Sequence, residues 1–485
     1  MNSLLQRLVE LAQTHPHTLA LSETGRQLTY GELWPALQQQ AQHLSQAGVQ
    51  RLALQLDNGI DWALLDLSCA LAGIVVIPVP GFFSAEQRRW LLESSGADTL
   101  VGPAVEGWQP STLLPGLPCW RQQPTVVPPL PAGTAKITYT SGTTGQPKGV
   151  CLSLELQVTT AQALAQSVAS SRVERHMTLL PLATLLENLA GLYVPLLLGA
   201  GACLPGLAEV GFTGSSQLNP ARLAAALARW QPHSLVLVPE LLRLLLVICH
   251  HQPQLAHSLR LVAVGGGKVA PALLQQASAM GIVAQEGYGL SECGSVVALN
   301  TPTANRPGTV GRPLPHLRVR IADDGEICVR GATMLGYLSG GSASADLGSE
   351  IATGDLGRLD ADGFLHITGR KKNVQITAFG RNFSPEWVEA EAQGCSAIAR
   401  LVIMGDALPA NVALVQPVPG QEAALAEQIA ELNHRLPDYA RIHHWLVPEP
   451  SLAATGLLTA NGRPRRTLIR QAFATQIQHL TGVSA

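Results

Sequence analysis

One short run, residues 137–150 (ITYTSGTTGQPKGV), constrains the fold of this chain more than any other feature. Its residues 139–149 combine five hydroxyl side chains with three glycines and a lysine near the end. Glycines let backbone N–H groups turn toward one point, and such a concavity binds phosphate oxygens. Hydroxyls add further donors, and the ammonium group of Lys148 can neutralise a polyphosphate. We interpret the run as a phosphate-binding loop that follows a strand; the alternative is an ordinary polar turn. The candidate phosphate ligands are Thr140, Ser141, Gly142, Thr143, Thr144, Gly145 and Lys148.

The spacing distinguishes this loop from that of P-loop NTPases. Gly142, Gly145 and Lys148 follow the pattern G-x-x-G-x-x-K, whereas a P-loop carries G-x-x-x-x-G-K-[ST]. The run resembles the signature loop of the adenylate-forming superfamily, which includes acyl-CoA synthetases, peptide-synthetase adenylation domains and firefly-type luciferases. The resemblance implies that ATP is the nucleotide bound here.

Length and composition limit the class of protein. At 485 residues the chain is too long for one compact core, so two or more domains are expected. A hydrophobic fraction of 46% with 14% charged residues is typical of a globular protein with large buried sheets. The net charge of −2 and the aromatic content of 4% argue against a nucleic-acid partner.

Cysteine spacing and apolar runs bear on location. The eight cysteines show no C-x-x-C spacing, which favours buried free thiols in a reducing compartment. The N-terminal run contains Arg7 and Glu10 and predicts an amphipathic helix, not a signal peptide. The longest apolar run, residues 62–81, is interrupted by Asp66 and two prolines, so we interpret it as a helix leading into a buried strand. We expect a cytoplasmic protein without a membrane span.

Helices alternate with apolar strands along most of the chain. Residues 28–80 contain two such pairs, and residues 221–280 contain three helices separated by the strands SLVLV and LRLVAV. This alternation predicts an α/β fold with parallel sheets covered by helices. Residues 102–135 hold eight prolines and predict an irregular connection instead.

The pattern changes after residue 310. Asp324-Gly325 and Asp362-Gly363 each stand between alternating strands and predict β-hairpins, while residues 338–350 predict a flexible surface loop. Residues from 372 onward form a smaller α+β unit, with helices expected near 384–393 and 421–435. Together with the resemblance, this implies a large N-terminal domain (1–371) of stacked, helix-covered sheets with a β subdomain, followed by a small mobile C-terminal domain (372–485).

A second motif, residues 286–292 (EGYGLSE), strengthens the resemblance because the superfamily carries G-Y-G-x-[ST]-E at this distance. By itself a glycine–aromatic–glycine run is more often a simple turn. The resemblance implies that Tyr288, with Gly289 beside it, stacks on adenine, that Ser291 contacts phosphate, and that Glu292 holds the Mg²⁺ bound to ATP. A carboxylate is a suitable ligand for this hard cation.

A third motif spans residues 353–382, where the superfamily carries T-G-D and then G-R-x-K. Asp355 lies in a tight turn in which its carboxylate can accept hydrogen bonds from two ribose hydroxyls, and Arg370 could approach the same ribose. The alternative is a solvated turn and a surface arginine. By resemblance, Lys372 is the hinge of the small domain, and Gly380 lines the channel for a pantetheine thiol because glycine leaves room there.

The acid-binding residues are less clearly marked. Thr184 and Glu187 lie in a run that resembles the P-L-x-H-x-x-E segment of long-chain acyl-CoA synthetases, with threonine in place of histidine. No aspartate stands where amino-acid-activating domains bind the substrate ammonium, so an apolar carboxylic acid is favoured. The alternative is a plain buried helix. The glycines that leave space for the acid are Gly265, Gly266, Gly267 and Gly287.

The last motif departs from the family pattern. GLLTANGRPRR (456–466) matches the terminal G-K-x-x-R element, but Arg463 stands where the family has a lysine that acts in adenylation. Arginine keeps the charge but differs in shape and bulk. We count Lys148, Glu292 and Arg463 as the candidate catalytic residues.

The resemblance implies a two-step reaction. An acid and MgATP give acyl-AMP and pyrophosphate, and the acyl group then passes to a thiol, with CoA as the expected acceptor. One alternative is an acyl-AMP ligase that loads the phosphopantetheine arm of an acyl carrier protein. Another is a nucleotide-binding pseudoenzyme or half-reaction protein, which the substitutions at Arg463, Thr184 and Asn373 suggest.

Overall fold

Two large sheets form the centre of the N-terminal part of the protein. The computed structural model describes residues 2–124, 126–140, 147–213, 217–338, 350–377, 382–459 and 462–482. The nine strands of the first sheet lie in the order β18 (Arg312–Pro313), β17 (Ala298–Leu299), β16 (Ala284–Tyr288), β15 (Leu261–Val264), β14 (Ser234–Leu237), β10 (Arg175–Met177), β11 (Gly201–Cys203), β1 (Leu19–Glu23) and β2 (Arg26–Thr29). The eight strands of the second lie in the order β21 (Gly336–Tyr337), β9 (Lys148–Ser153), β8 (Thr134–Thr140), β4 (Val75–Pro78), β3 (Arg51–Leu54), β5 (Thr99–Val101), β7 (Cys119–Arg121) and β6 (Gln109–Ser111).

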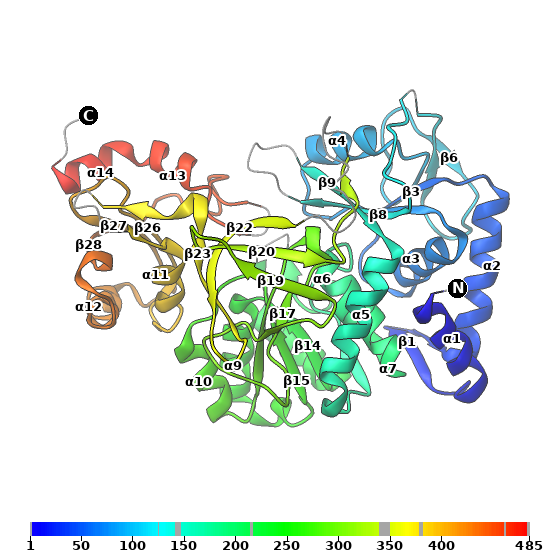
Figure 1. Ribbon diagram of the computed structural model, residues 1–485, viewed down its shortest axis with the longest axis horizontal. Coiled ribbons are helices and arrows are strands. Elements are labelled where there is room, and N and C mark those ends of the chain that lie inside the picture. Colours follow the sequence, from blue (N-terminus) through cyan, green and yellow to red (C-terminus); the bar gives the residue numbers. More distant parts are fainter. Residues whose placement is uncertain are drawn as a thin grey trace.

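Helices cover both sheets, as the alternating pattern predicts (Figure 1). The inner strands of each sheet, such as β14, β15 and β16, run parallel, and antiparallel strands stand at the edges. The helix α2 begins with a capping box in which Thr29 and Glu32 exchange hydrogen bonds. The α-helices of this part and a π-helical turn, η2, have these bounds: α1 (Ser3–Thr14), α2 (Tyr30–Gln46), α3 (Ile60–Ala72), α4 (Ala85–Ser95), α5 (Leu154–Val168), α6 (Leu185–Glu187), η2 (Asn188–Tyr193), α7 (Val194–Leu198), α8 (Pro220–Trp230), α9 (Pro239–His251) and α10 (Pro271–Ala279).

The proline-rich stretch 102–135 is more regular than the sequence predicts. Strands β6 and β7 pair with each other, and β7 pairs antiparallel with β5 at the edge of the second sheet. An edge strand needs hydrogen bonds on one side only, so it tolerates Pro110 within β6. The prediction of a wholly irregular connection was therefore wrong.

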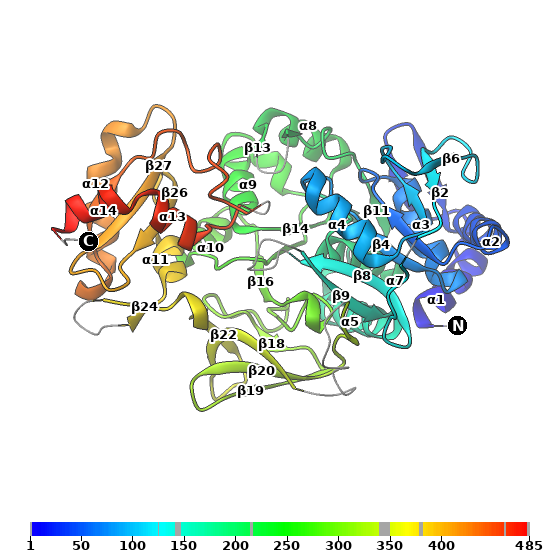
Figure 2. The same ribbon diagram turned by 90° about the horizontal axis from the view of Figure 1, so that it is seen from above.

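The β subdomain is a four-stranded antiparallel sheet in the order β19 (Leu317–Ile321), β20 (Glu326–Gly331), β22 (Ile351–Leu359) and β23 (Leu365–Arg370). Both hairpins stand where Asp-Gly predicts them, with β19 paired to β20 and β22 paired to β23. An apolar cluster packs Leu317, Ile327 and Leu365 of the subdomain against Cys293 and against Ala298 of β17 in the first large sheet. Figure 2 shows this sheet along one side of the molecule, between the N-terminal sheets and the C-terminal unit. The loop expected at 338–350 falls almost entirely outside the described residues.

The C-terminal unit has its own core. Its sheet has the order β26 (Ile398–Met404), β27 (Asn411–Pro417) and β28 (Ile442–Leu446). Two apolar clusters, one on each side of this sheet, contain only residues from 383 onward. The helices are α11 (Pro385–Ala392), α12 (Leu425–Arg435), α13 (Arg466–Ala472) and α14 (Ala474–Thr481). The α/β class, with a large N-terminal and a smaller C-terminal domain, is confirmed, while the boundary at residues 371 and 372 stays a prediction.

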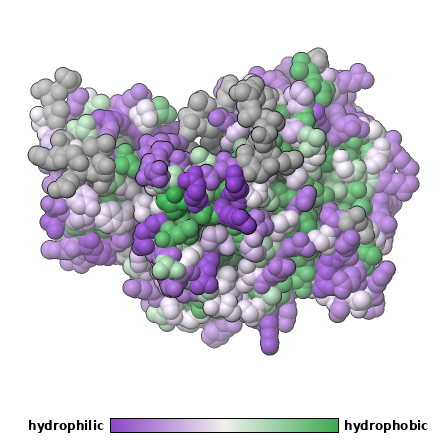
Figure 3. All heavy atoms as spheres, viewed as in Figure 1, coloured by the Kyte–Doolittle hydropathy of each residue, from purple (hydrophilic) through white to green (hydrophobic). Residues whose placement is uncertain are grey.

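The surface and the cysteines agree with a globular protein. In Figure 3 hydrophobic side chains lie among hydrophilic ones over the visible face. All eight cysteines are free and buried, as their spacing predicts. Within the part of the chain that the structure describes, every helix is too short or too polar to cross a bilayer.

Candidate active site

A single cleft of about 2570 Å³ brings the separate motifs together. Its walls come from both large sheets, the β subdomain and the C-terminal unit. Ser141, Gly142, Thr143, Thr144, Gly145 and Gly380 lie outside the described residues. Of the other candidate residues, all except Glu187 line the cleft: Thr140, Lys148, Thr184, Gly265, Gly266, Gly267, Gly287, Tyr288, Gly289, Ser291, Glu292, Asp355, Arg370, Lys372 and Arg463.

The two ends of the phosphate loop lie next to each other. Thr140, the last residue of β8, pairs across the strands with Lys148, the first residue of β9. The Lys148 ammonium lies 5.8 Å from the centre of the Tyr337 ring, within the range of a cation–π contact. Tyr337 belongs to β21, which pairs with β9. Tyr337 lies beside Lys148 because two segments far apart in the chain pair with each other. The sequence alone therefore did not identify Tyr337 as a residue of the site.

Tyr337 also orients Glu292. Its hydroxyl donates a hydrogen bond of 3.0 Å to Glu292 Oε1, while Oε2 has no hydrogen-bond partner within the described ranges. Burial and the neighbouring carboxylate raise the pKa of Tyr337, which keeps it protonated as a donor. Mg²⁺ is typically held by one or two carboxylates together with substrate phosphates. One free carboxylate oxygen fits that pattern, and no cluster of three or more His, Cys, Asp or Glu side chains in the described residues could hold a metal alone.

Tyr288, Asp355 and Arg370 form one hydrogen-bonded cluster. The Tyr288 hydroxyl donates to Asp355 Oδ2 at 2.7 Å, and Arg370 Nε lies 2.7 Å from Asp355 Oδ1. Burial raises the pKa of Asp355, and Arg370 opposes this shift. Gly289 is required by the close backbone at this turn, because a Cβ there would lie 1.9 Å from Ser295 O. The motif at 286–292 and the motif at 353–382 therefore meet, as a shared nucleotide site requires.

Arg463 reaches the glycine run from the C-terminal unit. Its Nη2 donates to Gly266 O at 2.9 Å. The glycines follow β15 directly, and Gly266 has a φ of +76°, which favours a residue without a side chain. The Arg463 side chain is exposed to the open cleft. The surrounding walls nevertheless desolvate it in part, which lowers the pKa of Arg463, and the nearby charge of Arg370 lowers this pKa further.

A tight turn holds Arg463 in this position. Thr459 N donates to Arg463 O at 2.8 Å, and Arg463 N donates to Thr459 Oγ1 at 3.0 Å. Gly462 has a φ of +73°, which the turn needs. Arg466, just beyond the turn, lies 2.6 Å from Glu389 of α11 and ties the segment to the domain core. The turn restricts how far Arg463 can move independently of its domain.

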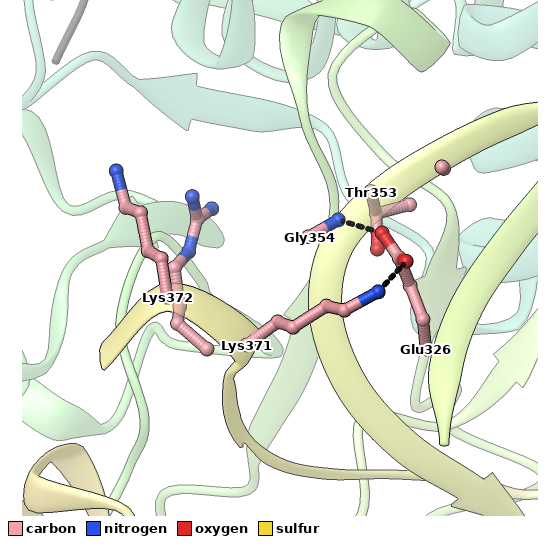
Figure 4. A pocket seen from close by; sticks show the side chains of 7 residues that line it. Glu326, Thr353, Gly354, Lys371 and Lys372 are labelled. Atoms are coloured by element: carbon pink, nitrogen blue, oxygen red, sulfur yellow. Dashed lines mark hydrogen bonds and ion pairs between the residues drawn. The ribbon is translucent and has the colours of Figure 1, made fainter. Parts of the chain in front are cut away.

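The segment around the expected hinge has one lysine anchored by ion pairs, Lys371, and one without an ion pair in the described residues, Lys372. Lys371 Nζ lies 2.5 Å from Asp324 Oδ2 and 2.8 Å from Glu326 Oε2, at the β19–β20 turn. Figure 4 shows Lys372 pointing away from this pair, and the two lysines border a cavity of about 400 Å³. The pKa of Lys372 is lowered by partial burial and by nearby Arg370.

A second contact joins the C-terminal unit to the large domain. Arg243 of α9 donates to Ile398 O at 2.6 Å and to Cys395 O at 2.8 Å. Nearby, Gln393 Nε2 donates to Lys268 O at 3.3 Å. The sequence gives no sign of Arg243, because it lies in an amphipathic helix whose charged residues are ordinarily solvated.

Thr184 and Glu187 have different surroundings. Thr184 lines the cleft and donates its hydroxyl to Pro181 O at 2.6 Å. Glu187 is completely buried behind the wall, where Oε1 lies 3.0 Å from His176 Nε2. His176 in turn is 2.9 Å from Ser234 Oγ of β14. Glu187 therefore supports the wall of the cleft, and its completely buried side chain is not accessible to a substrate.

The chain is similar in sequence to known enzymes. Long-chain-fatty-acid–CoA ligase FadD15 of Mycobacterium bovis is 28% identical, over 76% of this chain and 73% of its own length. Feruloyl-CoA synthase of an Amycolatopsis species is 27% identical, over 89% of this chain and 92% of its own.

Among solved structures, the anthranilate CoA ligase AuaEII in complex with anthranoyl-AMP superposes with a TM-score of 0.81, at 20% identity and 98% coverage of both chains. That likeness establishes the fold. A family model described as AMP-binding enzyme matches residues 8–338, and one for the AMP-binding enzyme C-terminal domain matches residues 373–481. The resemblance noted in the sequence is thereby confirmed, and the chain belongs to the family of AMP-binding enzymes.

Proposed function

We propose that the protein activates an apolar monocarboxylic acid with MgATP and transfers the acyl group to the thiol of CoA. The observation that carries the proposal is the convergence of Lys148, Glu292, the Tyr288–Asp355–Arg370 cluster and Arg463 on one cleft. The names of the relatives, fatty-acid and aryl-acid CoA ligases, support the same reaction.

The first step needs alignment and charge neutralisation more than covalent help from the protein. A carboxylate oxygen attacks the α-phosphorus of ATP, and the bond from that phosphorus to pyrophosphate breaks. Lys148 neutralises the leaving phosphates, and Asp355 with Arg370 holds the ribose. Arg463 can donate to the attacking carboxylate and to an α-phosphate oxygen at once, because its guanidinium presents several fixed donors.

The second step exchanges one leaving group for another. The thiol sulfur attacks the acyl carbon, the bond to the AMP oxygen breaks, and the thiol proton passes to solvent.

The apolar part of the acid would lie along the aliphatic wall of the cleft, which includes Leu185, Leu186 and Val194. Burial of such a body is favourable by about 25 cal/mol per Å², so acids with larger apolar bodies should bind more tightly until the wall ends.

Pyrophosphate release with a panel of fatty and aryl acids tests the proposal. We expect release that depends on the acid, with an acyl-CoA thioester appearing only when CoA is present. The same assay with a phosphopantetheinylated carrier protein in place of CoA tests the alternative acceptor. No release with any acid would exclude the ligase and favour a nucleotide-binding protein without adenylation.

Glu292 supplies a separate prediction. Bound Mg²⁺ would neutralise phosphate charge, and Glu292 would hold it through Oε2, the oxygen that the hydrogen bond from Tyr337 does not use. Glu292→Gln removes the charge and keeps the bond from Tyr337, so the Mg²⁺ concentration for half-maximal ATP binding should rise about tenfold or more. Titration of ATP binding against Mg²⁺ measures this directly. Glu106→Gln, an exposed residue away from the cleft, is the matched control, and equal Mg²⁺ requirements in both variants would contradict the assignment.

A further inference from the structure

The segment behind the acid-binding wall contains a π-helical turn that a buried charge network holds in place. In η2, Val194 N donates to Leu189 O, five residues back. Such turns hold one residue more than an α-helical turn and are frequent at functional sites. Residues on both sides of η2 line the cleft, Leu185 and Leu186 before it and Val194 and Pro195 after it.

One carboxylate group contacts both ends of the turn. Asp66 Oδ2 accepts from Asn188 Nδ2 at 3.0 Å and from the Tyr193 hydroxyl at 2.8 Å. In an α-helix, residues five apart lie about 140° apart around the axis. Two such side chains would point in different directions, so a shared acceptor oxygen favours the π-helical form. Asp66 therefore selects the geometry of this turn.

Lys136 completes the network from the strand that leads into the phosphate loop. Its Nζ lies 2.8 Å from Asp66 Oδ1, bonds to Asn188 Oδ1, and lies 5.3 Å from the centre of the Tyr193 ring. The side chains of Lys136 and Asp66 are 3% and 0% exposed. A buried ion pair of this kind contributes little net stability against an apolar replacement, and its best-attested role is to specify one arrangement.

A second set of contacts holds the same turn from the other sheet. Glu187, the residue before η2, bonds to His176 of β10. A Cβ on Gly191 would lie 2.9 Å from His176 Nε2 and closer still to Glu187, so a side chain at this position would displace the Glu187–His176 pair. Consecutive residues, Glu187 and Asn188, thus connect η2 to the first and the second large sheet.

We propose that Asp66, held by Lys136, is a positioning residue that keeps residues 188–193 in the π-helical form and thereby sets the depth of the acid-binding cavity. If the turn relaxed to an α-helix, the residues after it would shift by one position, which is a rotation of about 100° and a translation of about 1.5 Å. Val194 and Pro195 would then present a different surface to the acid. The part of the inference that concerns the acid rests on the proposed function, whereas the part that concerns the geometry of the turn does not.

Tyr193→Phe tests the proposal with the smallest change. It removes one donor to Asp66 and keeps the ring. Tyr30→Phe is the matched control, since Tyr30 is equally buried in the same apolar cluster and its hydroxyl donates to Ala200 O at 2.8 Å, away from Asp66. Each variant loses one buried hydrogen bond, and the loss of stability should be larger in Tyr193→Phe because its acceptor is a carboxylate and not a backbone carbonyl.

The expected result is a change in acid preference. In Tyr193→Phe the ratio of kcat/KM for the longest and the shortest accepted acids should change about tenfold, while the KM for ATP stays as in the parent. The double variant Asp66→Leu/Lys136→Met, which removes both charges together, should change the ratio in the same direction. Tyr30→Phe should keep the parental ratio.

Three outcomes would overturn the inference: a parental ratio in Tyr193→Phe, an equal fall in kcat/KM for every acid, or the same change in Tyr30→Phe. Crystal structures of Tyr193→Phe and of the double variant give a readout independent of activity, because a retained π-helical turn in both would also overturn it. If the parent activates no acid, the proposed function fails, and these crystal structures still decide whether Asp66 controls the turn.

Discussion

Arg463 has the clearest chemical consequence of any single residue. Its guanidinium lies in the cleft, 2.9 Å from Gly266 O and within the electrostatic reach of Asp355. We predict that Arg463→Ala slows acyl-AMP formation by on the order of a hundredfold, comparable to the loss of one preorganised donor in a transition state. Single-turnover measurement of pyrophosphate release checks this. Transfer of the acyl group from preformed acyl-AMP to CoA should change little.

Two further variants separate charge from position. Arg463→Lys keeps the cation but loses the planar set of donors, so it should recover only part of the rate. Arg470→Ala, an exposed arginine of the same unit paired with Asp406 at 2.9 Å, should leave the rate unchanged. Adenylate formation at the parental rate in Arg463→Ala would show that this guanidinium is not used in the first step.

Glu286 predicts a pH dependence of stability. Burial raises its pKa to about 7 from the ordinary 4.5, despite a hydrogen bond from Gly308 N and the nearby charge of Lys268. A carboxyl group with a raised pKa binds more protons in the folded state than in the unfolded state between these two values. Stability therefore falls as the pH rises from about 4.5 to about 7, by on the order of 3 kcal/mol.

Glu286→Gln should abolish this part of the dependence, because an amide does not titrate. The free energy of unfolding of the variant relative to the parent, measured by urea denaturation across that pH range, should shift in favour of the variant as the pH rises. The exposed control Glu106→Gln should show no such trend. A parallel pH dependence in Glu286→Gln and the parent would argue against a raised pKa.

The residues that sequence reasoning found and missed differ in one respect. Tyr288, Glu292 and Asp355 lie in contiguous motifs, where local spacing already points to the chemistry. Tyr337 and Arg243 act through partners far away in the chain, and no local pattern marks them. Their contacts follow from tertiary packing, which local spacing does not specify.

At the scale of elements, periodicity predicted most helices and strands of the large domain. Helices α8, α9 and α10 and the strands between them lie where the alternation of apolar residues indicates. The π-helical turn 188–193 escaped prediction, because its run LLENLAGLYVPLLL is apolar on nearly all sides and carries no clear period. Asp66 was interpreted only as an interruption of an apolar stretch, although it forms an ion pair with Lys136 inside the core.

The short element 371–373 is where a hinge prediction can be tested. Lys371 is fixed to Asp324 and Glu326, so rotation should begin after it. Lys372→Pro fixes φ at that position and restricts the residue before it. We predict that the ratio of the adenylation rate to the thiol-transfer rate changes, with the direction set by the conformer trapped. The ratio is obtained by measuring the rate of each half-reaction separately.

Lys372→Ala is the control for charge, because it removes the ammonium group but leaves the backbone free. An equal loss of both rates in the proline variant would count against a hinge.

At the scale of the whole molecule, the position of the C-terminal unit depends on its contacts with the large domain. Arg243 supplies two of them, to Ile398 O and Cys395 O, and the same unit carries Arg463 into the cleft. Hydrogen bonds from a charged group are each worth about 1.5–3 kcal/mol. Arg243→Met should therefore reduce the population with Arg463 in the cleft by about tenfold or more.

The expected result has a structural and a kinetic part. The distance between fluorophores on the two domains should lengthen in Arg243→Met, and acyl-AMP formation should slow in proportion to the population lost. The control is Arg229→Met, an exposed arginine of α8 whose contacts with Glu209 and Trp230 stay within the large domain. Because the hydrogen bonds of Arg243 go to Ile398 O and Cys395 O and not to the Tyr288–Asp355–Arg370 cluster, the KM for ATP should not move with the rate. An unchanged interdomain distance together with parental adenylation would mean that the turn carrying Arg463 holds its position without help from α9.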